Sequence, residues 1–255
     1  MTIKELIFFW QITAKKIITP FKFDYDVYKK HGCDVVYSGH PFADLNYDLE
    51  PPKLNMEEKE WTVGILFGSR YQEIKKLSPV FIKSMKTLND MLSSNIRFVI
   101  PIAYPEYKKT IEKIIDNHKS ILKDIQYTFL EGENKDFVYK YSDALIMSSG
   151  TASLIAACYG KPMVICYRIS YITFFLGKLL TNIKYIGMPN VMLNEEAAPE
   201  LLQSDCNPNA ITSHIMKYLA DKEYYKKTSD NLMKVRYMLG EKNVLERVAK
   251  EIINS

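Results

Sequence analysis

The sequence predicts an α/β protein: a Rossmann-like parallel sheet flanked by helices. Three observations lead to this fold class. Short apolar runs that suit strands buried on both faces recur from residue 61 onward. Segments in which apolar residues follow a helical spacing lie between these runs. The resulting order of strand, helix and strand is typical of βαβ units, which build parallel sheets.

The first strand is expected at 62–67, a continuous apolar run. A helix over 74–91 follows, because Leu77, Phe81, Met85 and Leu88 are spaced by four, four and three residues and share one helical face. Further strands are expected at 97–101, 125–130, 143–147 and 163–167. Helices are expected at 107–121 and 152–159, and consecutive helices at 209–253.

Residues 1–60 differ from the rest of the chain. The prolines at 20, 41, 51 and 52 interrupt them, and 49–60 is polar, as in a linker. At most a helix near 3–18 and a short strand at 35–37 precede that linker. Because so short a stretch buries little apolar surface, we expect it to lack a core of its own. The complete domain is expected to run from 61 to 255.

Composition narrows the classes of function. The 255 residues include 47% hydrophobic and 25% charged residues, the balance of a globular protein. The net charge of +4 is spread along the chain, so we expect no nucleic-acid partner. The cysteines form no C-x-x-C pair and the four histidines show no metal spacing, so we expect no metal site and buried thiols. Without an apolar run long enough for a membrane span, the chain is expected to be cytoplasmic.

Two loops at the ends of predicted strands have compositions that suit phosphate binding. Gly68, Ser69 and Arg70 combine close backbone approach, a hydroxyl and a guanidinium. The second loop, 149–151, places Ser149, Gly150 and Thr151 before a helix of small residues. Each loop alone is equally compatible with ordinary turn and capping chemistry. Both loops should lie at the carboxyl edge of the sheet, and together they favour a nucleotide diphosphate.

Two further segments are candidates for function. The apolar, aromatic segment 169–180 is flanked by basic residues and suits a membrane surface, a core helix or a partner interface. Its proposed membrane contacts are Arg168, Tyr171, Phe174, Phe175 and Lys178, with Lys184 nearby. The second segment contains Asn190, Glu200 and Gln203, whose side chains could bond a ribose or a uracil edge or simply belong to a capped helix start.

Six motifs occur in a fixed order along the chain. They are YSGHPFAD at 37–44, LFGSR at 66–70 with Glu73, SGTA at 149–152, KPMV at 161–164 with Tyr167 and Arg168, MPN at 188–190 and PELLQ at 199–203. In this order they closely resemble the lipid-A-disaccharide synthase family. The resemblance covers the chain from about residue 17 to its C-terminus.

The resemblance implies the donor-binding C-terminal domain of a GT-B glycosyltransferase. Such an enzyme joins UDP-2,3-diacylglucosamine to a lipid acceptor, 2,3-diacylglucosamine 1-phosphate, and releases UDP without a metal or other cofactor. It also implies a place on the inner face of the inner membrane of a Gram-negative cell, where lipid A for lipopolysaccharide is made. The site residues implied are Gly68, Ser69, Arg70 and Glu73 in one loop, Ser149, Gly150 and Thr151 in the other, and Asn190, Glu200 and Gln203 at the nucleotide.

The chain departs from the family pattern in two ways that bear on activity. The family's N-terminal Rossmann domain, which holds the acceptor pocket and the proposed general base, is represented only by a remnant within 1–60. Ile155 stands where the family usually carries a glutamate that bonds the ribose. The first hypothesis is therefore a donor-binding half that acts with a separately encoded N-terminal half. The alternatives are an inactive remnant, a nucleotide-sugar-binding module, or a related transferase of the cell envelope.

Overall fold

A computed structural model describes residues 14–168 and 184–254 of the chain. It divides the chain into two compact units, described separately below. The larger unit runs from Glu50 to Val235, and the smaller unit joins Met1–Leu49 to Arg236–Ser255. The C-terminal segment is thus grouped with the first residues of the chain, whereas the sequence assigned it to the domain over 61–255.

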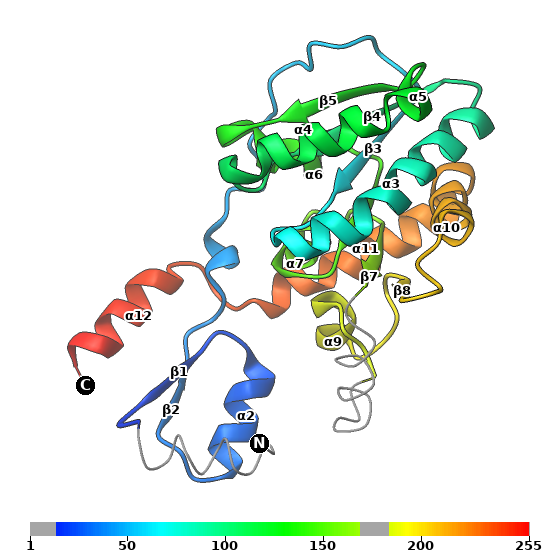
Figure 1. The fold of residues 1–255 in the computed structure, drawn as a ribbon. Helices are drawn as coiled ribbons and strands as arrows, with labels where there is room; N and C mark the ends of the chain where they lie inside the picture. The colour runs from blue at the N-terminus through cyan, green and yellow to red at the C-terminus, as the bar shows by residue number, and fades with distance from the viewer. Residues whose placement is uncertain (1–13, 169–183, 255) are drawn as a thin grey trace. The chain divides into compact units, whose positions relative to one another are not determined.

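The larger unit is built on a parallel six-stranded sheet, so the predicted α/β, Rossmann-like class is confirmed (Figure 1). The strand order is β5-β4-β3-β6-β7-β8. The strands are β3 (Trp61–Leu66), β4 (Ile96–Pro101), β5 (Gln126–Leu130), β6 (Ala144–Ser148), β7 (Met163–Tyr167) and β8 (Glu200–Leu202). The chain moves outward from β3 to β5 and then returns to β6 on the other side of β3, which creates a switch point between β3 and β6.

Helices cover both faces of this sheet. One face carries α3 (Tyr71–Met91), α4 (Lys108–Asn117), α5 (Lys119–Leu122) and α10 (Pro208–Ala220). Right-handed crossovers place α6 (Val138–Tyr141) and α7 (Thr151–Cys158) on the opposite face. Two more helices follow in the chain: α9 (Met188–Leu193), between β7 and β8, and α11 (Lys222–Met238), after α10.

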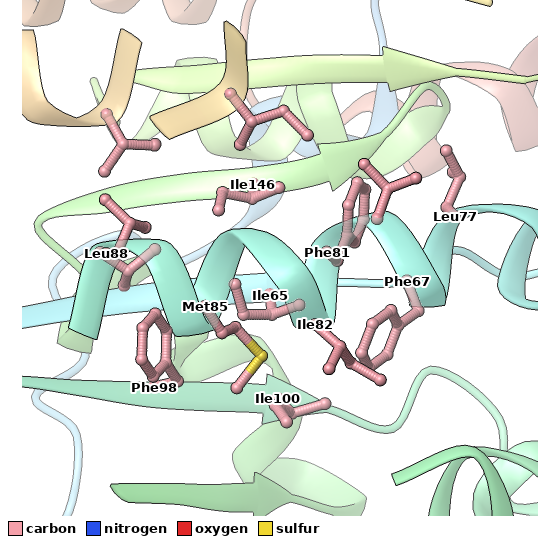
Figure 2. Close-up of a cluster of buried hydrophobic side chains, with 14 of the residues drawn as sticks. Ile65, Phe67, Leu77, Phe81, Ile82, Met85, Leu88, Phe98, Ile100 and Ile146 are labelled. Atoms are coloured by element: carbon pink, nitrogen blue, oxygen red, sulfur yellow. The ribbon is translucent and has the colours of Figure 1, made fainter. Parts of the chain in front are cut away.

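The core lies between the sheet and α3. Alternate residues of β3, such as Val63 and Ile65, face α3 and are fully buried. Figure 2 shows Phe81, Met85 and Leu88 of α3 among the strand side chains. Phe67 and Phe81 stack with their ring centroids 5.9 Å apart. The spacing read from the sequence therefore identified the buried face of this helix correctly, and this core fixes the strand ends that carry the loops.

The sequence was wrong about three element boundaries or assignments. The helix expected at 107–121 is divided, because α4 ends before His118 and α5 begins at Lys119. Strand β8 was not foreseen, because only three residues pair and only one of them, Leu201, is buried. The helix expected near 3–18 does not extend to residue 18 because Ile17–Thr19 forms strand β1; residues 1–13 lie outside the described part.

The smaller unit contains a two-stranded parallel sheet, β1 with β2 (Val35–Tyr37), and helix α2 (Lys22–Lys30), which the sequence did not predict. The short helix η1 (Pro41–Asp44) follows. Helix α12 (Val244–Ile253) begins against Asp44, whose carboxylate accepts the N–H groups of Asn243 and Val244 at 2.5 and 3.0 Å. Arg247 donates from Nη2 to the carbonyl of Ser38 at 2.9 Å. The motif at 37–44 therefore holds the C-terminal helix within this unit.

Two features of the described residues bear on membrane and metal chemistry. Among the helices of the described residues, none combines the length and the hydrophobicity needed to cross a membrane. Within the same residues, no group of three or more His, Cys, Asp or Glu side chains is placed to hold a metal ion. All four cysteines are buried, as the sequence predicts.

Candidate functional site

A pocket of about 280 Å³ lies at the carboxyl edge of the large sheet. Its wall includes Gly68 and Ser69 after β3 and Ser149, Gly150 and Thr151 after β6. The two loops selected from the sequence thus line one pocket, because β3 and β6 are neighbouring parallel strands whose carboxyl ends meet at the switch point. The parallel pairing, and not proximity in sequence, brings the loops together.

Gly68 is a residue that the loop geometry requires. Its φ of +114° lies in a region that favours glycine. A Cβ atom at this position would stand 2.7 Å from Oε2 of Glu73 and 2.9 Å from Oγ of Ser148. The loop therefore turns tightly enough for the largely buried Glu73 carboxylate and the end of β6 to pack against it.

Arg70 lies at the N-terminus of α3, outside the residues that line the pocket. Its Nη1 donates to Oε1 of Glu73 at 3.1 Å, and the Arg70 side chain is 78% exposed while that of Glu73 is 15% exposed. This exposed i,i+3 pair adds little to stability. The pair instead links the guanidinium of Arg70, which is next in sequence to the pocket residue Ser69, to a carboxylate on the first turn of α3.

The second loop begins the first turn of α7. The N–H of Ser149 bonds to the carbonyl of Cys166 at 3.2 Å, which ties the loop to β7. The Oγ of Ser153 donates to the Gly150 carbonyl at 2.7 Å. The first N–H groups of a helix have no intrahelical partner, and here Gly150, Thr151 and Ala152 all line the pocket. This end of α7 is chemically suited to an anion.

Asn190 and Glu200 do not line this pocket but bond to one another. Asn190 is fully buried, and its Nδ2 donates to Oε1 of Glu200 at 2.8 Å and to the carbonyl of Ala198 at 2.7 Å. The Glu200 carboxylate also accepts the N–H groups of Ile186 and Gly187, at 2.8 and 2.9 Å. These contacts hold the start of α9 against β8. A contact of either side chain with a nucleotide stays a prediction.

Gln203 and Arg168 lie near the carboxyl ends of β8 and β7. Gln203 has a positive φ of +50°, and its N–H bonds to the carbonyl of Tyr167 at 2.9 Å. Arg168 donates from Nη2 to the carbonyl of Cys206 at 2.5 Å, so part of its guanidinium fixes the start of α10. The other proposed membrane contacts lie outside the described residues: Tyr171, Phe174, Phe175 and Lys178.

The pocket also contains residues that the sequence did not single out. Tyr104 follows β4, and Lys135 and Asp136 belong to η3 (Gly132–Phe137), which follows β5. Tyr139 of α6 completes this wall, and burial, followed by the charge of Asp136, raises the pKa of its phenol. The sequence carries no signal at these positions, because they lack the glycines and serines that mark the other two loops. Their loops could have been inferred from the rule that the carboxyl ends of parallel strands lie at one edge of the sheet.

Ile155 faces the same pocket from the second turn of α7. The sequence departure at this position therefore falls within the candidate site. Its apolar side chain provides no acceptor for a hydroxyl group.

A second, larger hollow of about 790 Å³ lies along α11. Glu195, Glu196, Lys227 and Lys234 are among its lining residues, and Oε1 of Glu195 accepts a hydrogen bond from Asn231 at 2.7 Å. Its mixed charges are those of a solvated helix surface. It has neither the strand-end loops nor the free helix N-terminus of the smaller pocket, which we take as the candidate site.

Comparison with known proteins identifies the family. The sequence model described as lipid-A-disaccharide synthetase matches residues 13–253. The chain belongs to the lipid-A-disaccharide synthase family. It is 34% identical over 249 residues to the lipid-A-disaccharide synthase of Sulfurihydrogenibium sp., covering 92% of this chain and 64% of that protein. The corresponding enzyme of Persephonella marina is 34% identical over 246 residues, covering 91% and 63%.

The chain thus spans somewhat less than two thirds of the curated relatives that it matches. Of the motifs found in the sequence, residues 68–69 and 149–152 line the candidate pocket.

Solved structures share the fold at low sequence identity. The S. aureus MnaA–UDP structure has a TM-score of 0.62 at 16% identity and covers 95% of this chain and 61% of that one. UDP-GlcNAc 2-epimerase from Neisseria meningitidis, bound to UDP-GlcNAc, has a TM-score of 0.59 at 12% identity, covering 96% and 63%. The C-terminal domain of the group 1 glycosyl transferase LpcC from Francisella tularensis has a TM-score of 0.51 at 14% identity, covering 72% and 88%. The fold is that of GT-B glycosyltransferases and their relatives.

Proposed function

We propose that this chain is the donor-binding part of a lipid-A-disaccharide synthase. In the proposed reaction, UDP-2,3-diacylglucosamine donates its sugar to the 6-hydroxyl of 2,3-diacylglucosamine 1-phosphate. The new β-1,6 bond forms with inversion at the anomeric carbon, and UDP leaves. One observation carries the proposal: the family's two loops with phosphate-binding chemistry line a single pocket at the switch point of the sheet.

The residues of this pocket suit the leaving group of that reaction. The first turn of α7 offers backbone N–H groups to a phosphate, with the hydroxyls of Ser149 and Thr151 beside them. In the proposal, Arg70 leaves its exposed pair with Glu73 and neutralises the charge that develops on the departing UDP. Two fold neighbours were solved with UDP or a UDP-sugar, which is consistent with a uridine nucleotide as the ligand of this fold.

The acceptor pocket and the general base belong, in this proposal, to an N-terminal half that this chain does not match. The family relatives are longer than the part matched here, and such a half would supply what that extra length provides. The segment 169–180, with Arg168 and Lys184 at its ends, is proposed to contact the membrane surface that holds both lipid substrates. The place of action would then be the inner face of the inner membrane.

Calorimetric titration of the full chain with UDP tests the donor site. Binding in the micromolar range is expected, and Arg70→Ala should weaken it by about tenfold or more because a charge-assisted hydrogen bond is lost. Lys75→Ala is the matched control, since Lys75 is an exposed cation on the same helix and does not line the pocket. Absent or millimolar binding of UDP by the unaltered chain would overturn the donor-site proposal.

Disaccharide formation tests the division of labour. The chain is assayed alone and together with a candidate N-terminal half from the same genome. Product should form only when both chains are present. Turnover by this chain alone would contradict the assignment of the general base to an N-terminal half.

Ile155 offers a gain-of-function test of how the nucleotide is oriented. A carboxylate introduced by Ile155→Glu would reach into the pocket, where it could accept the ribose hydroxyls. UDP affinity should rise in this variant, whereas affinity for inorganic pyrophosphate should not. Ile155→Gln, which lacks the charge, should give a smaller gain; equal affinities for all three proteins would contradict this placement of the ribose.

Binding to vesicles tests the membrane proposal. Vesicles with a fraction of anionic lipid should retain the chain, and vesicles of neutral lipid should retain less of it. Charge removal at Arg168 and Lys184 together should release the protein from the anionic vesicles. Equal retention of the altered and unaltered chains would count against this surface.

A further inference from the structure

Positively charged side chains are unevenly distributed around the candidate pocket. Among the described residues that line it, Lys135 is the one with a cationic side chain. Arg70, the cation that the sequence assigned to the phosphate, lies outside the lining and is bonded to Glu73 at 3.1 Å. The positive side chain that lines the pocket is therefore Lys135, in the segment that follows β5.

The local structure holds Lys135 toward the pocket. Helix η3 follows β5 directly, and its residue 135 is half-buried. The Nζ atom donates a long hydrogen bond of 3.4 Å to the carbonyl of Ala103, in the loop after β4 that also lines the pocket. Within the described chain, none of the ion pairs involves Lys135. Its ammonium group, with three donors, retains capacity for an acceptor in the pocket.

The neighbouring charges define what that acceptor is. Asp136 lines the same pocket and lies close enough to Tyr139 to raise the pKa of its phenol. A cationic ligand would be repelled by both Lys135 and the positive end of α7, and a neutral ligand would leave both positive groups without a counter-charge. An anion satisfies the lysine and the helix end together, provided that it stands clear of Asp136.

We propose that Lys135 binds the diphosphate of the nucleotide donor, together with the first turn of α7. This inference rests on the proposed function, because it assumes that the pocket takes a nucleoside diphosphate. It adds a specific residue and a specific atom, Nζ of Lys135, to the binding chemistry. It also predicts that the lysine distinguishes UDP from uridine, because it contributes to binding of the phosphates and not to binding of the nucleoside.

Titration of the full chain with UDP and with uridine tests the proposal. The Lys135→Met variant keeps the length of the side chain and removes its charge. Its affinity for UDP should fall by about tenfold or more, the usual size of a lost charge-assisted hydrogen bond. Its affinity for uridine should not change. Lys135→Arg, which keeps a charge and its donors, should recover part of the UDP affinity.

Two controls separate this effect from changes in net charge and in folding. Lys140→Met removes the same charge from the adjacent helix α6, outside the pocket lining, and should leave UDP affinity unchanged. Asp136→Asn should preserve or strengthen UDP binding, because it removes a negative charge from the pocket wall. Thermal unfolding of each variant, followed by circular dichroism, establishes that the altered chains are folded.

The outcomes are distinguishable. If the unaltered chain does not bind UDP, the proposed donor site fails and this inference fails with it. If UDP binds but Lys135→Met binds it equally well, the donor site stands and the role of Lys135 is overturned. An equal loss of UDP and uridine binding also overturns it, because Lys135 would then shape the loop and not contact the phosphates. If Lys135→Met does not fold, the same comparison is made with Lys135→Gln.

Discussion

Asn190 gives the sharpest test of how this structure is held together beside the candidate site. The Asn190→Ala variant removes a fully buried amide whose Oδ1 accepts the N–H of Ala198 at 2.9 Å and whose Nδ2 donates to the Ala198 carbonyl at 2.7 Å. Both backbone groups of Ala198 would lose their partner, and Glu200 would lose a third donor. Each buried polar group left unpaired costs about 1–3 kcal/mol, so the loss should be about 3 kcal/mol.

That loss is measured as a change in the free energy of unfolding from urea titration. A unit of this size loses about 2–4 °C of Tm for each kcal/mol, so Tm should fall by about 6–12 °C. Asn207→Ala is the matched control. Asn207 caps α10 by accepting the N–H of Ala210, and its Nδ2 makes longer bonds to the carbonyls of Ser204 and Asp205, at 3.3 and 3.2 Å. Loss of this cap should cost about 1 kcal/mol. UDP affinity, measured well below the Tm, should be unchanged in Asn207→Ala.

The opposite result would refute this reasoning. If Asn190→Ala unfolds at the same urea concentration as the unaltered chain and yet binds UDP much more weakly, Asn190 is a nucleotide ligand. Its hydrogen bonds to Ala198 would then be incidental to stability.

Three further predictions concern the loop, the titration behaviour and the core. Gly68→Ala should lower the free energy of unfolding, measured by urea titration, by about 1–3 kcal/mol through backbone strain, and its close contacts should add to this loss. Gly132→Ala is the control: its φ is +56° and a Cβ there would meet nothing within 4 Å, so it should show the strain alone. Burial lowers the pKa of His214 below 6.5, so the unfolded chain takes up the proton first. Stability should therefore fall as the pH drops below 6.5, less so in His214→Gln, when Tm is measured against pH. Phe81→Ala should cost about 3–5 kcal/mol in urea unfolding by leaving a cavity beside Phe67; a loss below 1 kcal/mol would contradict the packing.

The sequence predicted the fold correctly where a strand is buried on both faces, because a continuous apolar run then supports one interpretation. The run at 62–67 and the spacing along 74–91 identified β3 and α3, because a central parallel strand and its crossover helix carry nearly all of their pattern in apolar residues. Strand β8 was missed, since an edge strand of three residues contributes too few apolar positions to stand out. The break at His118 was missed because Ile111 and Ile115 alone maintain a helical spacing up to it.

The candidate site divides in the same way. The loops at 68–70 and 149–151 could be found by composition, because a tight turn and a helix start each require particular residue types. Composition could not identify Lys135, since a lysine in a charged loop resembles any other solvated lysine. For Asn190 and Glu200 the structure adds the bonds that join them to each other and to buried backbone, which a sequence cannot show because a polar side chain looks the same whether it faces a ligand or a buried backbone group. Their contact with a nucleotide stays a prediction.

By itself, the sequence determined the family, the parallel sheet and the two loops that converge on the pocket. Those features depend on local patterns: apolar periodicity, turn chemistry and an ordered series of motifs. Only the tertiary structure decided which side chains face the pocket, because the order of parallel strands brings loops from β3, β4, β5 and β6 to one edge. It also assigned the motif at 37–44 to holding helix α12, through Asp44, since hydrogen bonds between residues some two hundred positions apart leave no trace in local sequence.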